Sequence, residues 1–236
     1  MKFAFQLWLL VFACGCSGTL NKVKRAPGFG IESLRQGGLM LAGVTALGGG
    51  EYAPGEAISR SFREALHEAE PDLRFVGLFE IRDLIGEERM ALFMKQFSES
   101  GEIPVGLFAE LRGDDMIPRY LAWVDITRDE PSRGDRQRRN VTYRWVTDGE
   151  GRSYQVVDRV DYVTTASAGR SVSAEFTVHE LSSGREVWSA RLSDGKTASE
   201  SRRNTFYYPA APRINAPGTF DVVEGILERA AKLLTH

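Results

Sequence analysis

The stretch LMLAGVTAL, residues 39–47, decides the fold, because it is a nearly unbroken apolar run that stops at three glycines, 48–50. A strand that is buried on both faces shows such a continuous run, whereas a strand with one face in water alternates apolar and polar residues. We therefore expect residues 39–47 to form a central strand of a sheet that is covered on both sides.

A helix and a second strand are predicted directly after this strand. In PGEAISRSFREALHEAE, residues 54–70, apolar side chains recur at helical spacing, and Pro54 suits the first turn of a helix. LRFVGLFEI, residues 73–81, is the second strand candidate. The order strand, helix, strand implies a parallel pair with a right-handed crossover.

The rest of the chain completes a mixed α/β fold in one domain. Met and Phe side chains share one stripe of a predicted helix over 87–101, and the segment 171–193 alternates about the turn-like SSG at 182–184. The further elements that we expect are a short helix over 104–111, a strand over 119–127, an antiparallel hairpin over 171–193 and a final helix with Thr219 as its N-cap.

Residues 128–170 stand outside this order. RDEPSRGDRQRRN, residues 128–140, contains Pro, Gly and many charges, and predicts a basic loop. Residues 141–165 alternate about the turn-like TDGEG and predict a projecting hairpin. The core needs this insertion least, so we take it as a possible partner surface, formed by Arg133, Arg136, Arg138, Arg139, Tyr143 and Trp145.

The four arginines of this insertion allow two interpretations. A run of charges is ordinarily a solvated loop. The sharper hypothesis is a contact with anionic lipid headgroups or with an acidic partner.

Residues 1–15 have the layout of a secretory signal peptide. Met1 and Lys2 give a positive start, and Phe3–Ala13 is a mostly apolar run. This run is shorter than the roughly 20 residues that span a bilayer as a helix. We therefore expect the protein to be exported.

The two cysteines of the chain, Cys14 and Cys16, follow this run. Ala or Gly before Cys resembles the lipobox of bacterial lipoproteins, which implies that the thiol is acylated, for instance with palmitate, and that the cysteine becomes the new N-terminus. We favour Cys16, because it leaves the longer signal and is followed by small residues; Cys14 is the alternative. A disulfide between the two would be strained.

Residues 16–36 combine Gly, Pro and four cationic side chains without a sustained period, and predict a flexible tether. A tether of this length spans roughly 25 Å, which would keep the domain over 37–236 near its membrane. The whole chain has 42% apolar and 26% charged residues and a formal net charge of −2. These values fit one domain with a substantial core and give no sign of a nucleic-acid binder.

The sequence offers little material for catalysis or for binding a metal or cofactor. SDGKT, residues 193–197, ends like a phosphate-binding loop, but it lacks the first glycine and the following helix, so a strand or hairpin end is the better interpretation. His67 is expected in solvent and His179 on the polar face of its strand, while His236 is the last residue. No two histidines have metal-ligand spacing.

Nucleophiles and paired acids are equally unspecific. TASAG, residues 165–169, has Thr where a nucleophile elbow needs its first Gly. The adjacent acids Glu87 with Glu88, and Asp114 with Asp115, are explained by a helix start and by a loop. We therefore predict a protein that is not an enzyme and has no cofactor or metal.

The acylated cysteine, the strand at 39–47, the helix at 54–70 with the following PDLRFVGLFEIRDLIGEE, and the hairpin SVSAEFTVHELSSGREVWSARL together resemble two families. They are the periplasmic domain of the curli secretion channel lipoproteins and the lipoprotein activators of penicillin-binding proteins. The resemblance implies a non-enzymatic envelope protein that binds other proteins or assembles with itself. It departs from the channels, since charges interrupt 140–165 and residues 194–218 are short and polar.

Our leading hypothesis is an outer-membrane lipoprotein that faces the periplasm and acts as a protein-binding adaptor in cell-envelope assembly. The alternatives are a subunit of an oligomeric curli-type export channel and an enzyme that acts on cell-wall material. The expected partners are envelope proteins or further copies of the chain, with the membrane reached through the N-terminal lipid.

Overall fold

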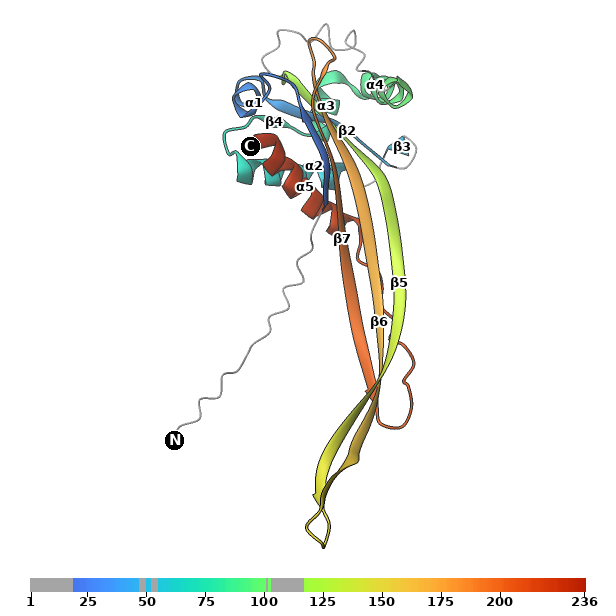
Figure 1. The fold of residues 1–236 in the computed structure, drawn as a ribbon. Coiled ribbons are helices and arrows are strands. Elements are labelled where there is room, and N and C mark those ends of the chain that lie inside the picture. The colour runs from blue at the N-terminus through green and yellow to red at the C-terminus, as the bar shows by residue number, and fades with distance from the viewer. Residues whose placement is uncertain (1–18, 47–49, 52–54, 101, 103–116) are drawn as a thin grey trace, which may run out of the picture.

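The computed structural model describes residues 19–46, 50–51, 55–100, 102 and 117–236. Its strands form one mixed sheet in the order β1-β7-β6-β5-β2-β3, with β4 paired to β2. Helices lie on this sheet, so the predicted single-sheet α/β class is confirmed. Figure 1 shows a helix-covered body from which three strands continue as a long, narrow arm.

The central strand β2 (Leu39–Ala46) is buried on both faces, as the apolar run predicts. It pairs in parallel with β5 on one side and antiparallel with the short β3 (Gly50–Glu51). Leu39 and Leu41 join one hydrophobic cluster, whereas Met40 and Ala42 join another on the opposite face. The alternation of a strand therefore feeds two cores, one on each side of the sheet.

Helices on both faces of the sheet supply the two cores. The predicted helices α2 (Gly55–Ala69) and α5 (Thr219–Thr235) contribute to the larger cluster on one face. On the other face lie α3 (Leu78–Ile85) and α4 (Glu87–Ser100), whose Met90, Phe93 and Phe97 form the expected apolar stripe. The short helix predicted over 104–111 lies outside the described residues.

The strand predicted over 73–81 is mostly wrong. Only β4 (Phe75–Val76) is extended, and it pairs in parallel with β2 at Leu39 and Met40, so the predicted parallel relationship holds for two residues. The chain then turns into α3, because Leu78, Ile81 and Ile85 recur at helical spacing and are buried. The Glu80 carboxylate accepts a hydrogen bond from the Gly77 N–H at 2.5 Å and so caps the helix start.

The flexible tether predicted over 16–36 is wrong for most of its length. Thr19–Arg25 form β1, which pairs antiparallel with β7, and Ile31–Gly37 form α1, whose Leu34 is fully buried. An edge strand such as β1 can be short and polar because only one of its edges must pair. Its sequence therefore shows no apolar period from which a strand could be predicted. Residues 16–18 lie outside the described part.

The arm consists of β5 (Tyr120–Thr147), β6 (Ser153–Glu180) and β7 (Glu186–Asn204). The predicted basic loop over 128–140 is wrong, since β5 runs straight through it, paired residue by residue with β6. Pro131 is tolerated there because β5 has lost its partner β2 beyond Ile126 and is an edge strand. The predicted hairpin is confirmed, with a turn at Asp148–Gly151.

Two predictions, one in β7 and one at the start of α5, have different outcomes. SDGKT continues β7 as a strand, as expected. Thr219 begins α5 but is not its N-cap, because Gly218 occupies that position and its N–H donates to Asp221 at 2.9 Å. Among the described residues, no helix is long and apolar enough to cross a membrane.

Candidate interaction surface

The arm is fixed to the body by a buried polar network. Arg170 of β6 donates to Asp129 of β5 at 2.7 Å, to the Thr219 hydroxyl at 2.6 Å and to the Pro217 carbonyl at 2.8 Å. Thr219 in turn donates to Asp129 at 2.7 Å. The carboxylate and guanidinium are about four-fifths buried. These contacts tie two strands of the arm to the start of α5, which explains why Thr219 is not free to cap the helix.

Segment 205–218 returns from the tip of β7 to α5 along one face of the arm, which we call the covered face. Small side chains leave room for it, since Ala166 and Ala168 of β6 are buried under the segment. Tyr208 packs edge-on against Tyr162, with ring centroids 4.9 Å apart. The opposite face of the arm, which we call the open face, is polar and carries Ser167, Thr165 and Ser199.

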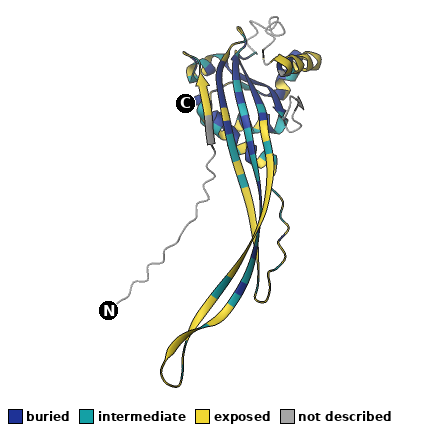
Figure 2. Cartoon of the chain, turned by 45° about the vertical axis from the view of Figure 1, so that its right-hand side comes forward, coloured by how far each residue is buried: buried dark blue, intermediate teal, exposed yellow. Residues whose placement is uncertain are grey.

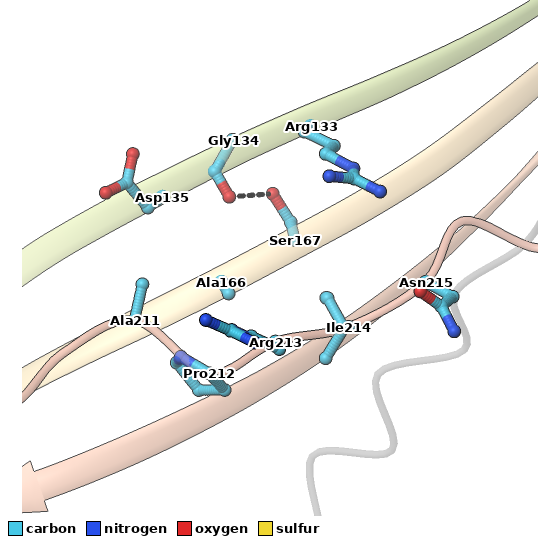
Figure 3. A pocket seen from close by; sticks show the side chains of 10 residues that line it. All are labelled: Arg133, Gly134, Asp135, Ala166, Ser167, Ala211, Pro212, Arg213, Ile214 and Asn215. Atoms are coloured by element: carbon cyan, nitrogen blue, oxygen red, sulfur yellow. Dashed lines mark hydrogen bonds between the residues drawn. The ribbon is translucent and has the colours of Figure 1, made fainter.

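A hollow of about 450 Å³ lies between β5, β6 and the return segment (Figure 3). Arg133 and Arg213 contribute cationic side chains to it from opposite sides. The hollow is open to solvent and has a mixed polar and apolar lining, which differs from the enclosed apolar pockets that usually hold cofactors.

The structure divides the four predicted arginines between the two faces of β5. Successive side chains of a strand point to opposite faces, and the pairing of β5 with β6 is regular from Arg128 to Thr142. Arg133 and Arg139 are therefore on the covered face, and Arg136 and Arg138 are on the open face. All four are exposed.

These arginines also differ from most other arginines of the chain in having no acidic partner. Arg119, Arg159, Arg191 and Arg229, for example, each lie within 3.0 Å of a carboxylate oxygen. In the part of the chain that the structure describes, no hydrogen bond or ion pair involves the side chain of Arg133, Arg136, Arg138 or Arg139. The arm thus presents positive charge that the protein itself does not neutralise.

The tip of the arm carries exposed apolar side chains. Tyr143 and Trp145 are 56% and 68% exposed, and Val157, which is paired with Tyr143, is 54% exposed. Tyr154 on the returning strand is 48% exposed. Figure 2 shows that exposure rises along the arm from the buried body. Large apolar side chains that gather at an exposed end generally indicate a contact with another molecule.

Both long edges of the arm lack a strand partner. Beyond Ile126, β5 has only β6 as a neighbour, and beyond Ser193, β7 also has only β6, within the described residues. The sequence indicates the arginines and aromatics but not these edges, because it predicts a loop over 128–140 of β5 and no long continuation of the strand beyond 197 in β7. The alternation of small polar residues in β7 was the available signal.

The histidines give one correction. His67 is exposed, as predicted. His179 is not on a solvated face, because α4 covers that face and Phe97 packs edge-on against the imidazole, with centroids 5.7 Å apart. Burial lowers the pKa of His179, and the hydrogen bond between its Nδ1 and the Gly184 carbonyl, at 3.2 Å, fixes the ring. The residue is a satisfied core histidine.

The remaining candidate residues are two pairs of adjacent acids and the two cysteines. Glu87 and Glu88 lie in the first turn of α4, where acids favour the helix dipole. Cys14, Cys16, Asp114 and Asp115 are outside the described residues. A search of the described residues finds no group of three or more His, Cys, Asp or Glu side chains that could hold a metal.

Comparison with known proteins gives weak likenesses to solved structures. A single-substitution variant of the PelC dodecamer from Paraburkholderia phytofirmans is 12% identical, with a TM-score of 0.40, over 92% of this chain and 98% of that one. A second PelC dodecamer structure is 10% identical, with a TM-score of 0.35, over 92% and 94%. Lipoprotein GNA1162 from Neisseria meningitidis is 15% identical, with a TM-score of 0.25, over 82% and 94%.

No protein-family model matches the chain. No curated protein matches it either. The resemblance to curli secretion channels and to synthase activators stays a prediction.

Proposed function

We propose that this chain is a lipid-anchored protein of the bacterial envelope that is not an enzyme and acts as an adaptor, with the arm as its contact for a partner protein. The supporting observation is that the arm carries arginines without acidic partners and exposed apolar side chains at its tip. Four unpaired arginines lead along β5 to an exposed cluster of Tyr143, Trp145 and Val157. Aromatic and arginine side chains are the residue types that dominate protein interfaces.

The remaining parts fit this role. Helices cover both faces of the body sheet and the polar network at Arg170 holds the arm to it, so the body can act as a rigid mount. The signal peptide and acylated Cys16 expected from the sequence would place the mount on the outer membrane, facing the periplasm. The open hollow beside Arg133 offers no enclosed site for a reaction.

Site-specific photo-crosslinking in intact envelopes tests this function. A photoreactive amino acid at Trp145 should give a discrete adduct with another protein. The same amino acid at Phe79 of α3, which is 55% exposed on the body, is the matched control and should give none. Trp145→Ser combined with Tyr143→Ser should lower the yield of an adduct made from Val157, because the aromatic contact is lost.

Two results would contradict the adaptor hypothesis. One is an equal pattern of adducts from positions 145 and 79, which would mean that the tip meets neighbours only by chance. The other is hydrolysis of purified peptidoglycan by the isolated protein, which would favour the enzyme alternative.

A further inference from the structure

The free edge of β7 carries a charge pattern that is complementary to itself. Between Asp194 and Arg202 the pairing of β7 with β6 is regular, so every second side chain lies on the same face. On the covered face the series reads Asp194, Lys196, Ala198, Glu200 and Arg202. The charges are negative, positive, none, negative and positive. Turned end over end about Ala198, the series meets an opposite charge at each charged position. Asp194 is largely buried and already lies 3.0 Å from Arg229 of α5, and Glu200 lies 3.8 Å from Arg202, so the central pair of Lys196 with Glu200 carries the complementarity.

From this pattern we infer that β7 pairs antiparallel with β7 of a second copy of the chain, around a two-fold axis at Ala198. Such an axis stands perpendicular to the sheet, so residues of the same face meet across the new strand pair. Lys196 then lies opposite Glu200 of the partner subunit, and Ala198 lies opposite its own copy. The sheet continues from one subunit into the other, and the unpaired backbone groups of both edges are satisfied.

Neighbouring registers are unfavourable. An axis at Ser199 places Lys196 opposite Arg202 of the partner subunit, which brings two positive charges together. An axis at Thr197 places Lys196 opposite Ala198 of the partner subunit and Glu200 opposite Asp194 of the partner subunit, whose carboxylate is already paired with Arg229, so neither Lys196 nor Glu200 gains an opposite charge. Directly opposed like charges destabilise a strand pair, so the axis at Ala198 is selected.

The length of the free edge agrees with the same register. On the body, β1 occupies the edge of β7 up to the pair of Thr19 with Ser193, so pairing with a second copy can begin only at Asp194. The register about Ala198 uses Asp194 to Arg202 on each copy and stops where the partner's β1 begins. The strand ends two residues later, at Asn204. The free edge therefore has the length that the proposed pairing needs.

The two edges of the arm also differ in how they are protected. Proline and clustered charge are the usual means by which proteins keep an edge strand from pairing, and β5 has Pro131 and the arginine series. From Asp194 to Arg202, β7 has no proline, and its charged residues are of mixed sign and separated by small side chains. The Lys196 side chain takes part in no hydrogen bond or ion pair within the described residues, so it is available to a partner.

Charge reversal tests the pairing in the full chain, with Cys14→Ser and Cys16→Ser as background substitutions. The protein is kept in mild detergent, and its oligomeric state is measured by sedimentation. We expect the parent to dimerise and Lys196→Glu or Glu200→Lys to raise the dimer dissociation constant roughly tenfold or more, because each creates two like-charge contacts. Lys196→Glu combined with Glu200→Lys restores a self-complementary series and should restore the dimer. Arg60→Glu on the exposed face of α2 makes the same change of charge far from β7 and should have no effect.

Mixing the two single variants is the sharper comparison. Lys196→Glu and Glu200→Lys each fail to pair with themselves, but together they present opposite charges and should form a mixed dimer. Unchanged circular dichroism of each variant would show that the exposed substitutions leave the fold intact. A parent that stays monomeric, or a dimer that is indifferent to the charge reversals, overturns the inference.

Oxidative cross-linking tests the register independently. In the same cysteine-free chain, Ala198→Cys should form a disulfide between two copies. Thr197→Cys and Ser199→Cys should cross-link only when mixed, because each lies opposite the other. Self-cross-linking of either variant at the yield of Ala198→Cys overturns the register. The proposed adaptor contact lies on β5 and the tip, so loss of the β7 dimer and loss of the Trp145 adduct are separate results.

Discussion

Gly43 in the central strand has no side chain because an indole ring occupies the space. A Cβ at Gly43 would overlap the ring of Trp123 on the neighbouring strand. Trp123 is held there by its Nε1–H, which donates to Thr45 at 3.2 Å, and by packing against Phe97, with ring centroids 4.2 Å apart. The ring therefore has little freedom to move away from an added methyl group.

We expect Gly43→Ala to lower the free energy of unfolding by about 2 kcal/mol, because overpacking forces the ring or the backbone to shift. Urea unfolding followed by tryptophan fluorescence measures this change. Gly149→Ala in the tip turn is the control, since no atom lies within 4 Å of the added Cβ. Equal stability of the two variants would show that the Trp123 site can expand at no cost.

His179 should make stability depend on pH. Burial lowers its pKa in the folded state, so the unfolded chain takes up the proton first as the pH falls. The contribution of His179 is then fully present above the unfolded pKa of about 6.5 and is lost as the pH falls toward the folded value. Urea unfolding at pH 7.5 and 5.5 should show a smaller loss for His179→Gln than for the parent. His67→Gln on exposed α2 should keep the loss seen in the parent.

Helices and strands that bury one or both faces in the core were predictable from the sequence. Those that are exposed on both faces were not. The stripe of Met90, Phe93 and Phe97 predicts α4, and the apolar run predicts β2, because burial imposes a period on the sequence. From Glu130 to Arg139, every residue of β5 is exposed, and the sequence there obeys no period. Its strand character comes from its register with β6, a long-range fact that local composition does not encode.

The candidate site was predictable in the same limited way. Arg133, Arg136, Tyr143 and Trp145 are recognisable as unusual residues in the sequence. Their division between two faces follows only once residues 128–140 are known to form a strand. The free edge of β7 likewise depends on strand assignments that the local composition does not indicate. The Arg170 network joins positions far apart in the chain, and no spacing rule connects them.

The junction of arm and body gives a prediction at the level of elements. Arg170→Gln leaves Asp129 and Thr219 without their shared donor in a largely buried position. We expect a loss of about 2 kcal/mol in the free energy of unfolding, below the usual cost of breaking a fully buried pair because some water reaches the site. Arg191→Gln, which breaks an exposed pair with Glu175, should cost less than about 1 kcal/mol. Equal losses in urea unfolding would mean that the network does not hold the arm.

The whole molecule should be much longer than a folded chain of its size. A compact chain of 236 residues has a radius of gyration of about 18 Å, whereas the arm adds a narrow projection to the body. Replacing residues 141–160 by Asn-Gly joins Asn140 to Asp161 through a two-residue turn. In small-angle scattering this change should shorten the monomer by roughly 30 Å while the body keeps its circular dichroism. An unchanged maximum dimension would mean that the arm folds back in solution.

The position at which β1 joins the sheet determines how the molecule would be oriented on a bilayer. Thr19 lies beside Ser193, level with the root of the arm, and three residues reach at most about 11 Å back to Cys16. From that level, β6 continues roughly 65 Å, from Ser173 to Ser153, in the direction of the arm. An acyl chain on Cys16 would thus hold the lipid surface close to the root, and hydrocarbon does not accept the charges on both faces of the arm. A lipidated molecule would lie with its long axis parallel to the membrane surface. The arm would then reach proteins beside it in the plane of the membrane instead of partners far from the surface.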